Sequence, residues 1–194
     1  MITGIVLAAG EGRRFGGTKQ IHEFERKPLA QHAIDALAAG GVDEVIVVTG
    51  HDADAVEGAL VLPDFGRFVR NRTYRDGQAT SLAAAFHEVA DESQAAVVLL
   101  GDQPGITAGD VRVLVERFLA TRRQIVRLRF ADGPGPSLLS REIYAEAGHL
   151  HGDVGARVLA ASHPEWVEEV DVDRPTPLDV DTPADLRDSS YPDD

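Results

Sequence analysis

Two spacings of hydrophobic residues alternate along the chain. Short continuous apolar runs occupy residues 2–8, Glu44–Thr49 and Ala95–Leu100. Runs of this kind are typical of central strands that are covered on both faces. Weaker strand candidates lie at residues 67–70 and 124–130, and in the second of these apolar and basic residues alternate, which indicates a half-exposed strand. We therefore expect a sheet whose centre is built from the continuous runs.

Helical spacing fills the intervals between these runs. Apolar residues within 29–37 form one stripe, and Gly40-Gly41 follows it where helices often end. Thr107 and Asp110 give a capping signal, after which apolar residues recur at i, i+3, i+4, i+7 and i+8. Two further stretches with helical spacing are residues 81–89 and 155–161.

Alternating strands and helices are typical of βαβ units, so the pattern predicts an α/β fold with a mostly parallel sheet and helices on both faces. The proline- and glycine-rich segments 132–136 and 174–177 are predicted to be loops. No internal repeat or low-complexity linker divides the 194 residues. We therefore expect one domain over residues 1–187, followed by an acidic C-terminal tail at 188–194.

Composition and charge narrow the classes of function. The chain carries 19 basic and 32 acidic residues, a formal net charge of −13. Duplex nucleic acids bind basic surfaces, so we expect no nucleic-acid partner. Cysteine is absent, which excludes disulfides, thiolate metal sites and cysteine nucleophiles and fits a reducing cytoplasm, the expected location. No apolar run approaches the roughly 20 residues that span a bilayer, so we expect no membrane partner.

The loop after the first predicted strand carries the strongest chemical signal. Residues 7–20 read LAAGEGRRFGGTKQ. Glycines let backbone N–H groups converge on phosphate oxygens, at the edge of an α/β sheet where ligands usually bind. Arg13, Arg14 and Lys19 form a local basic cluster in this acidic chain, suited to an anionic ligand. The spacing matches neither the Walker A sequence nor the dinucleotide fingerprint, so the glycines alone leave a flexible solvated turn as an alternative.

The complete string resembles the signature L-A-[AG]-G-x-[GS]-x-R-[FM]-G-x(1–2)-K of nucleotidyltransferases with a glycosyltransferase-A-like (GT-A-like) fold. The matching residues are Leu7, Ala8, Ala9, Gly10, Gly12, Arg14, Phe15, Gly16 and Lys19. The resemblance implies a three-layer Rossmann-like fold and a loop that surrounds a triphosphate, with Arg14 and Lys19 on the phosphates. The residues of this loop expected to bind nucleotide are Leu7, Ala8, Ala9, Gly10, Gly12, Arg13, Arg14 and Lys19.

Later segments resemble the molybdenum cofactor cytidylyltransferases, the MocA-like branch of the MobA-like NTP transferases. They are DGQATSLAA at 76–84, LGDQP at 100–104, LHGDVGAR at 150–157 and DVDTPADL at 179–186. The matches keep the order of the family and run from residue 2 to about 187, which argues against an unrelated doubly wound domain. By this resemblance Gly77, Ser81 and Asp102 also belong to the nucleotide site.

Asp102 is the expected metal ligand. It follows the apolar run Ala95–Leu100, which places a carboxylate at the carboxyl end of a central strand. Mg²⁺ binds a few hard oxygen ligands together with waters and substrate phosphates, so we expect Asp102 to bind Mg²⁺, with Asp153 as the second ligand. Helix-capping roles for Asp153 and for Ser81 stay open as alternatives. The closing segment 179–186 is expected to be structural, as the start of a final helix.

The acceptor side departs from the branch that the chain resembles. That branch carries G-H-P followed by aromatic-rich residues, whereas residues 132–141 read DGPGPSLLSR, without histidine. Gly135-Pro136 keeps the turn. The missing histidine and aromatic residues therefore affect the expected identity of the acceptor, whereas the motifs expected to bind the nucleotide are intact. His149 and His151 are two residues apart with no cysteine in the chain, which favours surface histidines over zinc ligands.

The resemblance implies transfer of CMP from CTP to a phosphate-ended acceptor, with release of pyrophosphate. In-line attack needs no covalent nucleophile, and the expected catalytic residues are Arg14, Lys19 and Asp102. The expected acceptor is molybdenum-bearing molybdopterin, with an apo-molybdoenzyme or a chaperone as a further partner. Ala9, where the guanylyl branch has glycine, favours cytosine. Open alternatives are GTP, a sugar, polyol or lactate phosphate acceptor, or a non-catalytic nucleotide- or cofactor-binding module.

Overall fold

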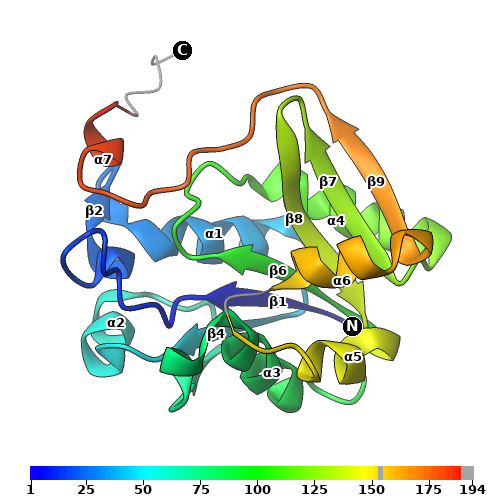
Figure 1. Cartoon of the computed structure of the whole chain (residues 1–194), viewed down its shortest axis with the longest axis horizontal. Coiled ribbons are helices and arrows are strands. Elements are labelled where there is room, and N and C mark those ends of the chain that lie inside the picture. Colours follow the sequence, from blue (N-terminus) through cyan, green and yellow to red (C-terminus); the bar gives the residue numbers. More distant parts are fainter. Residues whose placement is uncertain (153–154, 189–194) are drawn as a thin grey trace.

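A seven-stranded sheet forms the centre of the computed structural model, which describes residues 1–152 and 155–188 (Figure 1). Its strand order is β5-β4-β1-β6-β8-β7-β9. The strands are β1 (Ile2–Leu7), β4 (Glu44–Thr49), β5 (Gly66–Arg70), β6 (Ala95–Leu100), β7 (Ile125–Phe130), β8 (Gly133–Ser140) and β9 (Val167–Val172). Neighbouring strands from β5 to β6 are parallel, β9 is parallel to β7, and β8 runs antiparallel to β6 and β7. The fold is a single α/β domain of the GT-A-like class with a mostly parallel mixed sheet, as the sequence predicts.

Helices cover both faces of the sheet (Figure 1). They are α1 (Leu29–Gly40), α2 (Ala53–Ala59), α3 (Gln78–Glu88), α4 (Ala108–Thr121), α5 (Tyr144–Gly148), α6 (Ala156–Ser162) and the short α7 (Asp185–Asp188). One buried cluster joins α1, α2 and α4 to the sheet, and a second joins α3, α5 and α6 to its other face. Within the described residues, no helix is long and apolar enough to cross a membrane.

Local signals in the sequence explain where several helices begin and end. Gly41 has a φ of 93°, a left-handed conformation that glycine adopts without strain, and α1 stops there. Thr107 and Asp110 form the expected capping box of α4, since the Asp110 amide donates to Thr107 Oγ1 at 3.2 Å and the Thr107 amide donates to Asp110 Oδ2 at 2.8 Å. Both sequence predictions are confirmed.

The prediction of a loop at residues 132–136 is wrong, because β8 starts at Gly133. Proline cannot donate to a neighbouring strand, which is why the segment resembled a loop. β8 tolerates Pro134 and Pro136 because its pairing with β6 begins only at Ser137, and because its register with β7 shifts beside the prolines. Strand β9 was not anticipated, and residues 174–177 are irregular as expected.

A small hairpin anchors the C-terminal segment beside the glycine-rich loop. Its strands are β2 (Glu23–Phe24) and β3 (Lys27–Pro28). A third apolar cluster joins the hairpin to both segments; its members are Phe15, Phe24, Leu29, Leu178, Val180 and Leu186. Residues near position 20 and near position 180 are therefore held together by buried apolar surface.

Candidate functional site

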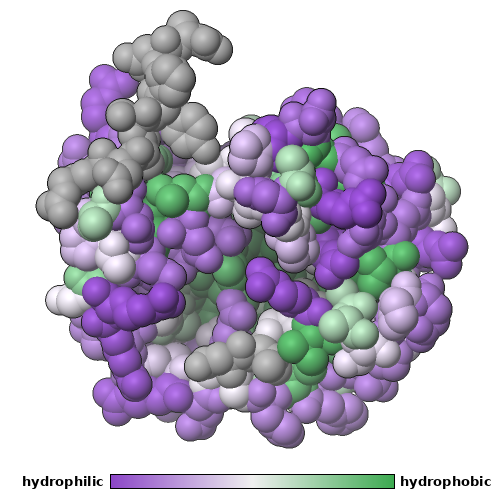
Figure 2. All heavy atoms as spheres, turned by 45° about the horizontal axis from the view of Figure 1, so that its top comes forward, coloured by the Kyte–Doolittle hydropathy of each residue, from purple (hydrophilic) through white to green (hydrophobic). Residues whose placement is uncertain are grey.

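A cleft of about 810 Å³ opens at the carboxyl ends of β1 and β6. Figure 2 shows a hollow in the middle of this face, surrounded mostly by hydrophilic side chains. Most of the residues expected to bind nucleotide line it: Leu7, Ala9, Gly10, Gly12, Arg13, Arg14, Lys19, Ser81 and Asp102. Ala8 is buried and Gly77 immediately precedes α3, and neither is among the lining residues.

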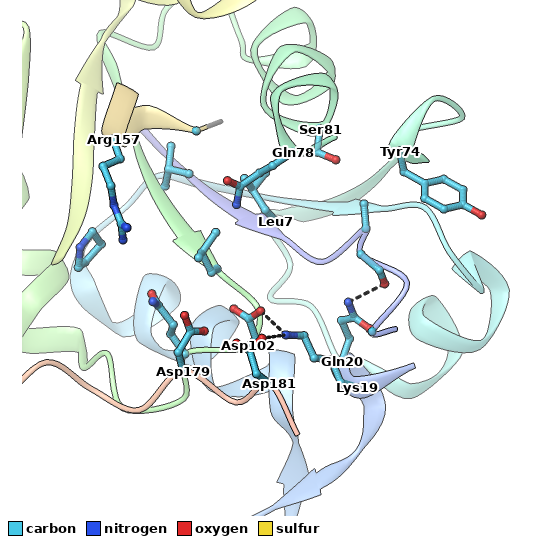
Figure 3. A pocket seen from close by; sticks show the side chains of 18 of the residues that line it. Leu7, Lys19, Gln20, Tyr74, Gln78, Ser81, Asp102, Arg157, Asp179 and Asp181 are labelled. Carbon is cyan, nitrogen blue, oxygen red and sulfur yellow. Dashed lines mark hydrogen bonds and ion pairs between the residues drawn. The ribbon is translucent and has the colours of Figure 1, made fainter. Parts of the chain in front are cut away.

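Lys19 is the electrostatic centre of the cleft. It begins the short 3₁₀ turn η1 (Lys19–Ile21) and is 8% exposed. Its Nζ lies 2.6 Å from Asp102 Oδ2 and 3.4 Å from Asp181 Oδ1, and it donates to the carbonyl of Val180 at 3.0 Å (Figure 3). Burial lowers the pKa of Lys19, but the two carboxylates outweigh burial and hold the pKa above its ordinary value. The ammonium group is therefore a fixed positive charge at the cleft.

Asp102 lies just beyond β6, as the sequence predicts, and its two carboxylate oxygens have different surroundings. Oδ2 pairs with Lys19, whereas Oδ1 is buried and has no hydrogen-bond partner in the described part of the chain. The Asp102 carbonyl accepts a hydrogen bond from the Val180 amide at 3.0 Å. This bond ties the C-terminal segment to the loop that carries the carboxylate. The free oxygen leaves Asp102 one acceptor to offer to a ligand.

Two aspartates of the C-terminal segment join the cleft, and sequence analysis had assigned that segment a purely structural role. Asp181 pairs with Lys19 and also with Arg14, whose Nη1 lies 2.8 Å from Asp181 Oδ2. Asp179 is exposed as a residue, but neighbouring atoms partly desolvate its carboxylate, which faces Asp102 (Figure 3). That desolvation and the negative charges of Asp102 and Asp181 raise the pKa of Asp179 to about 6. The D-x-D spacing was the signal in the sequence that could have identified this pair.

The glycine-rich loop is held by its own polar contacts. Gln20, which sequence analysis did not single out, donates from Nε2 to the carbonyl of Gly10 at 3.0 Å. Glu11 accepts from the side chains of Arg13 and of Arg75, the latter from the turn before α3. Those two guanidinium groups lower the pKa of Glu11. The loop is thereby connected to the far rim of the cleft.

The turn η2 (Tyr74–Asp76) and the first turn of α3 form the rim of the cleft opposite Lys19. Tyr74, Gln78 and Ser81 line this end of the cleft (Figure 3). Ser81 is 4% exposed and its Oγ accepts from Asn71 Nδ2 at 3.0 Å. The serine is thus in the first turn of the helix, as expected, and is already hydrogen-bonded to a neighbouring loop.

The predicted metal ligands are only partly covered by the structure. Asp153 lies outside the described residues. Within them, no three acidic or histidine side chains gather closely enough to hold an ion alone, and His149 and His151 are exposed. The free oxygen of Asp102 and the nearby carboxylates of Asp179 and Asp181 are hard donors that fit Mg²⁺ or Mn²⁺ when substrate phosphates and water complete the coordination.

Comparison with known proteins identifies the family. The model of the MobA-like NTP transferase domain matches residues 4–167. Nicotine blue oxidoreductase of Paenarthrobacter nicotinovorans is 31% identical, over 93% of this chain and 92% of that protein. A crystal structure of Rv0371c from Mycobacterium tuberculosis H37Rv has a TM-score of 0.86 and 34% identity, with 96% of each chain covered.

Two further structures bear on the metal and on the fold. Rv0371c has also been crystallised in complex with manganese, with a TM-score of 0.81, 33% identity and 96% of each chain covered. A nucleotidyl transferase from Methanothermobacter thermautotroptrophicus has a TM-score of 0.81 at 22% identity, over 97% of this chain and 95% of that chain, and so shares the fold. With a family match over most of its length, the chain belongs to the MobA-like NTP transferase domain family, whose activity is nucleotidyl transfer.

Proposed function

We propose that this protein transfers CMP from CTP to a phosphate-ended acceptor, molybdenum-bearing molybdopterin in the first instance, and releases pyrophosphate. The observation that carries the proposal is the convergence of Lys19 and Arg14 with Asp102 and Asp181 at one cleft. Cations that bind phosphates and carboxylates that bind a divalent ion are the two components of nucleotidyl transfer.

Arg14 and Lys19 would exchange their carboxylate partners for phosphate oxygens when the nucleotide binds. Both then stabilise the pyrophosphate that leaves. Asp102 would be one metal ligand, with Asp179 as the second ligand from the described residues and Asp153 as an alternative. The bound ion supplies charge neutralisation at the phosphoryl oxygens. A phosphate acceptor is ionised at neutral pH, so no side chain has to act as a strong general base.

The preference for CTP rests on Ala9, which we expect beside the nucleotide base. Ala9 lines the cleft and is 5% exposed, so its methyl group occupies space that glycine would leave empty. A smaller space favours a pyrimidine over a purine. The same chemistry with GTP, or with another phosphorylated acceptor, is the alternative within this proposal.

The test is calorimetric titration with CTP, GTP, ATP and UTP, each with Mg²⁺, followed by a pyrophosphate-release assay with the molybdenum cofactor. We expect CTP to bind most tightly and EDTA to abolish that preference. Asp102→Asn should lower turnover by about 100-fold or more, the usual cost of removing one group that stabilises transition-state charge. Asp64→Asn is the matched control, since Asp64 is exposed and precedes β5 at the opposite edge of the sheet.

Each outcome separates the alternatives. Tight binding of another nucleotide would keep nucleotidyl transfer and reject cytidylyl specificity. Binding without pyrophosphate release, for any acceptor tested, would indicate a non-catalytic module. Unchanged turnover in Asp102→Asn would remove Asp102 from the metal site.

An oxidoreductase is the second candidate, because one full-length relative carries that name. The chain has no cysteine, so a redox reaction would need an external electron carrier. A nicotinamide dinucleotide also carries phosphates that the loop around Lys19 could bind. Calorimetry with NADPH beside CTP decides between them: binding of NADPH but not of CTP would favour the redox function.

A further inference from the structure

The side of the cleft formed by β7, β8 and α6 has no role in nucleotide binding as proposed above. Three side chains lie in one row across its sheet: Val98 on β6 is paired with Ser137 on β8, and Ser137 is paired with Arg127 on β7. Directly paired residues point to the same face of a sheet. All three line the cleft, so Arg127 projects into it from the sheet.

The wall beside this row offers few polar groups. Pro134 and Pro136 of β8 line it and have no amide hydrogen to donate, and Val158 of α6 adds apolar surface. Most of the donors to a negatively charged ligand on this side are therefore side chains. They are Ser137, Gln103 and two arginines, Arg127 and Arg157.

Arg127 is the first arginine, and its pairing is incomplete. Its side chain is 18% exposed, and one guanidinium nitrogen pairs with Glu169 on β9. Glu169 Oε2 also lies 3.4 Å from Arg129 Nη1, so the charge of Glu169 is shared between two arginines. The Nε of Arg127 is buried without any hydrogen-bond acceptor in the described part of the chain. A buried donor of this kind is satisfied by a water or by a ligand.

Arg157 is the second arginine, and it faces the cleft from the opposite side. It lies at the start of α6, whose Leu159 and Ala160 pack on the same face of the sheet as β7 and β8. Figure 3 shows Arg157 reaching into the cleft on the side of Asp102 and Asp179, away from Tyr74. No ion pair joins Arg157 to any described residue, and the side chain is exposed.

The charged side chains that line the cleft also favour an anionic ligand. Among the described residues, its lining includes six basic and four acidic side chains, although the chain as a whole has a net charge of −13. Near Lys19 the basic groups are paired with carboxylates, whereas Arg157 has no carboxylate partner among the described residues and Arg127 is only partly paired. Arg157 is therefore a positive charge in the cleft that a ligand anion can pair with.

We propose that Arg127 and Arg157 form an anion clamp that binds the phosphate monoester of the acceptor. This proposal rests on the proposed function, and it identifies the residues that recognise the second substrate of that reaction. An oxygen of the clamped phosphate forms the new bond to the α-phosphorus, while the bond from that phosphorus to the bridging oxygen breaks and pyrophosphate leaves with the electron pair. Two guanidinium groups offset the repulsion between acceptor phosphate and nucleotide, and they take no proton.

The experiment measures phosphate binding to protein already saturated with α,β-methylene-CTP and Mg²⁺. The probes are inorganic phosphate and glycerol 3-phosphate, with glycerol as the uncharged control. Arg157→Gln and Arg127→Lys are compared with Arg123→Gln, a matched charge change at an exposed residue before β7, at the opposite end of that strand from the cleft. We expect both clamp variants to weaken phosphate binding about 10-fold or more, and Arg123→Gln to change it less than twofold.

The nucleotide affinity is measured in the same variants, and it keeps the two proposals separate. Unchanged nucleotide affinity with lost phosphate binding supports the clamp. Clamp variants that bind phosphate like the parent protein would overturn it, as would a parent protein that binds the nucleotide but no phosphate. If the nucleotide fails to bind, phosphate binding that still depends on Arg157 supports the clamp while the proposed function fails. Arg157→Gln changes an exposed side chain, so this variant still tests the clamp if Arg127→Lys does not fold.

Discussion

Replacing Lys19 by methionine tests the electrostatic centre of the cleft directly. Methionine keeps the unbranched side chain up to the ε position and removes the charged ammonium group. Three acceptors lose their donor: carboxylates on Asp102 and Asp181 and the carbonyl of Val180. Removing one partner of a fully buried ion pair costs about 3–5 kcal/mol, because the other charge stays buried and unpaired. The carboxylates here are 22% and 33% exposed, so we expect a smaller loss, about 2–4 kcal/mol.

The assay is urea unfolding at pH 7, with Lys27→Met as the control. Lys27 forms an ion pair with Asp35 in which both side chains are about half exposed, and such pairs contribute about 0–1 kcal/mol. The pKa of Lys19 is raised in the folded protein. Its contribution is therefore complete below the unfolded pKa of about 10.4 and is lost only as the pH rises above that value. Neutral pH thus measures the full effect.

A double-mutant cycle with Asp102→Asn isolates the pair from other effects. If Lys19 and Asp102 stabilise each other, the double variant should lose less than the sum of the single losses, by about 1–3 kcal/mol. The reasoning is refuted if the unfolding free energies of Lys19→Met and Lys27→Met lie within about 0.5 kcal/mol of each other, because Lys19 would then contribute no more than an exposed ion pair. Additive losses in the cycle would show that Lys19 acts through packing rather than through its charge.

Two further outcomes follow from the structure. In the metal-free protein the NMR signal of the Asp179 carboxyl carbon should titrate near pH 6, so the contribution of Asp179 to stability falls as the pH rises from about 4 to about 6. Asp181→Asn should lower this titration midpoint. A midpoint near pH 4 in the parent protein would contradict the crowding of carboxylates. Gly77→Ala should destabilise the fold by about 2 kcal/mol or more, since φ is 109° and a Cβ would lie 2.2 Å from the carbonyl carbon of Gly152. Gly58→Ala, a helical position with open space around it, should unfold at the same urea concentration or higher, and equal losses in the two variants would reject the steric argument.

Sequence by itself determined the features that depend on local spacing. Continuous apolar runs identified β4 and β6 because a central strand buries both faces over a few consecutive residues. Asp102 was placed at the carboxyl end of β6 for the same reason, and the Thr107 cap depends on residues only three apart. The glycine-rich loop with Arg14 and Lys19 is likewise a short contiguous string. In each case the interaction that defines the feature lies within one element.

Tertiary structure decided what depends on residues far apart in the chain. Lys19 meets the Val180 carbonyl across 161 positions because a buried apolar cluster holds the two segments together, and no local spacing in the sequence encodes that contact. Strand β8 exists because β6 and β7 provide partners on either side, although its two prolines disfavour a strand locally. Arg127 and Arg157 are separate in the sequence and face one cleft only after α6 packs on the sheet. Long-range strand pairing and burial, rather than residue type, therefore bring these two arginines to the cleft.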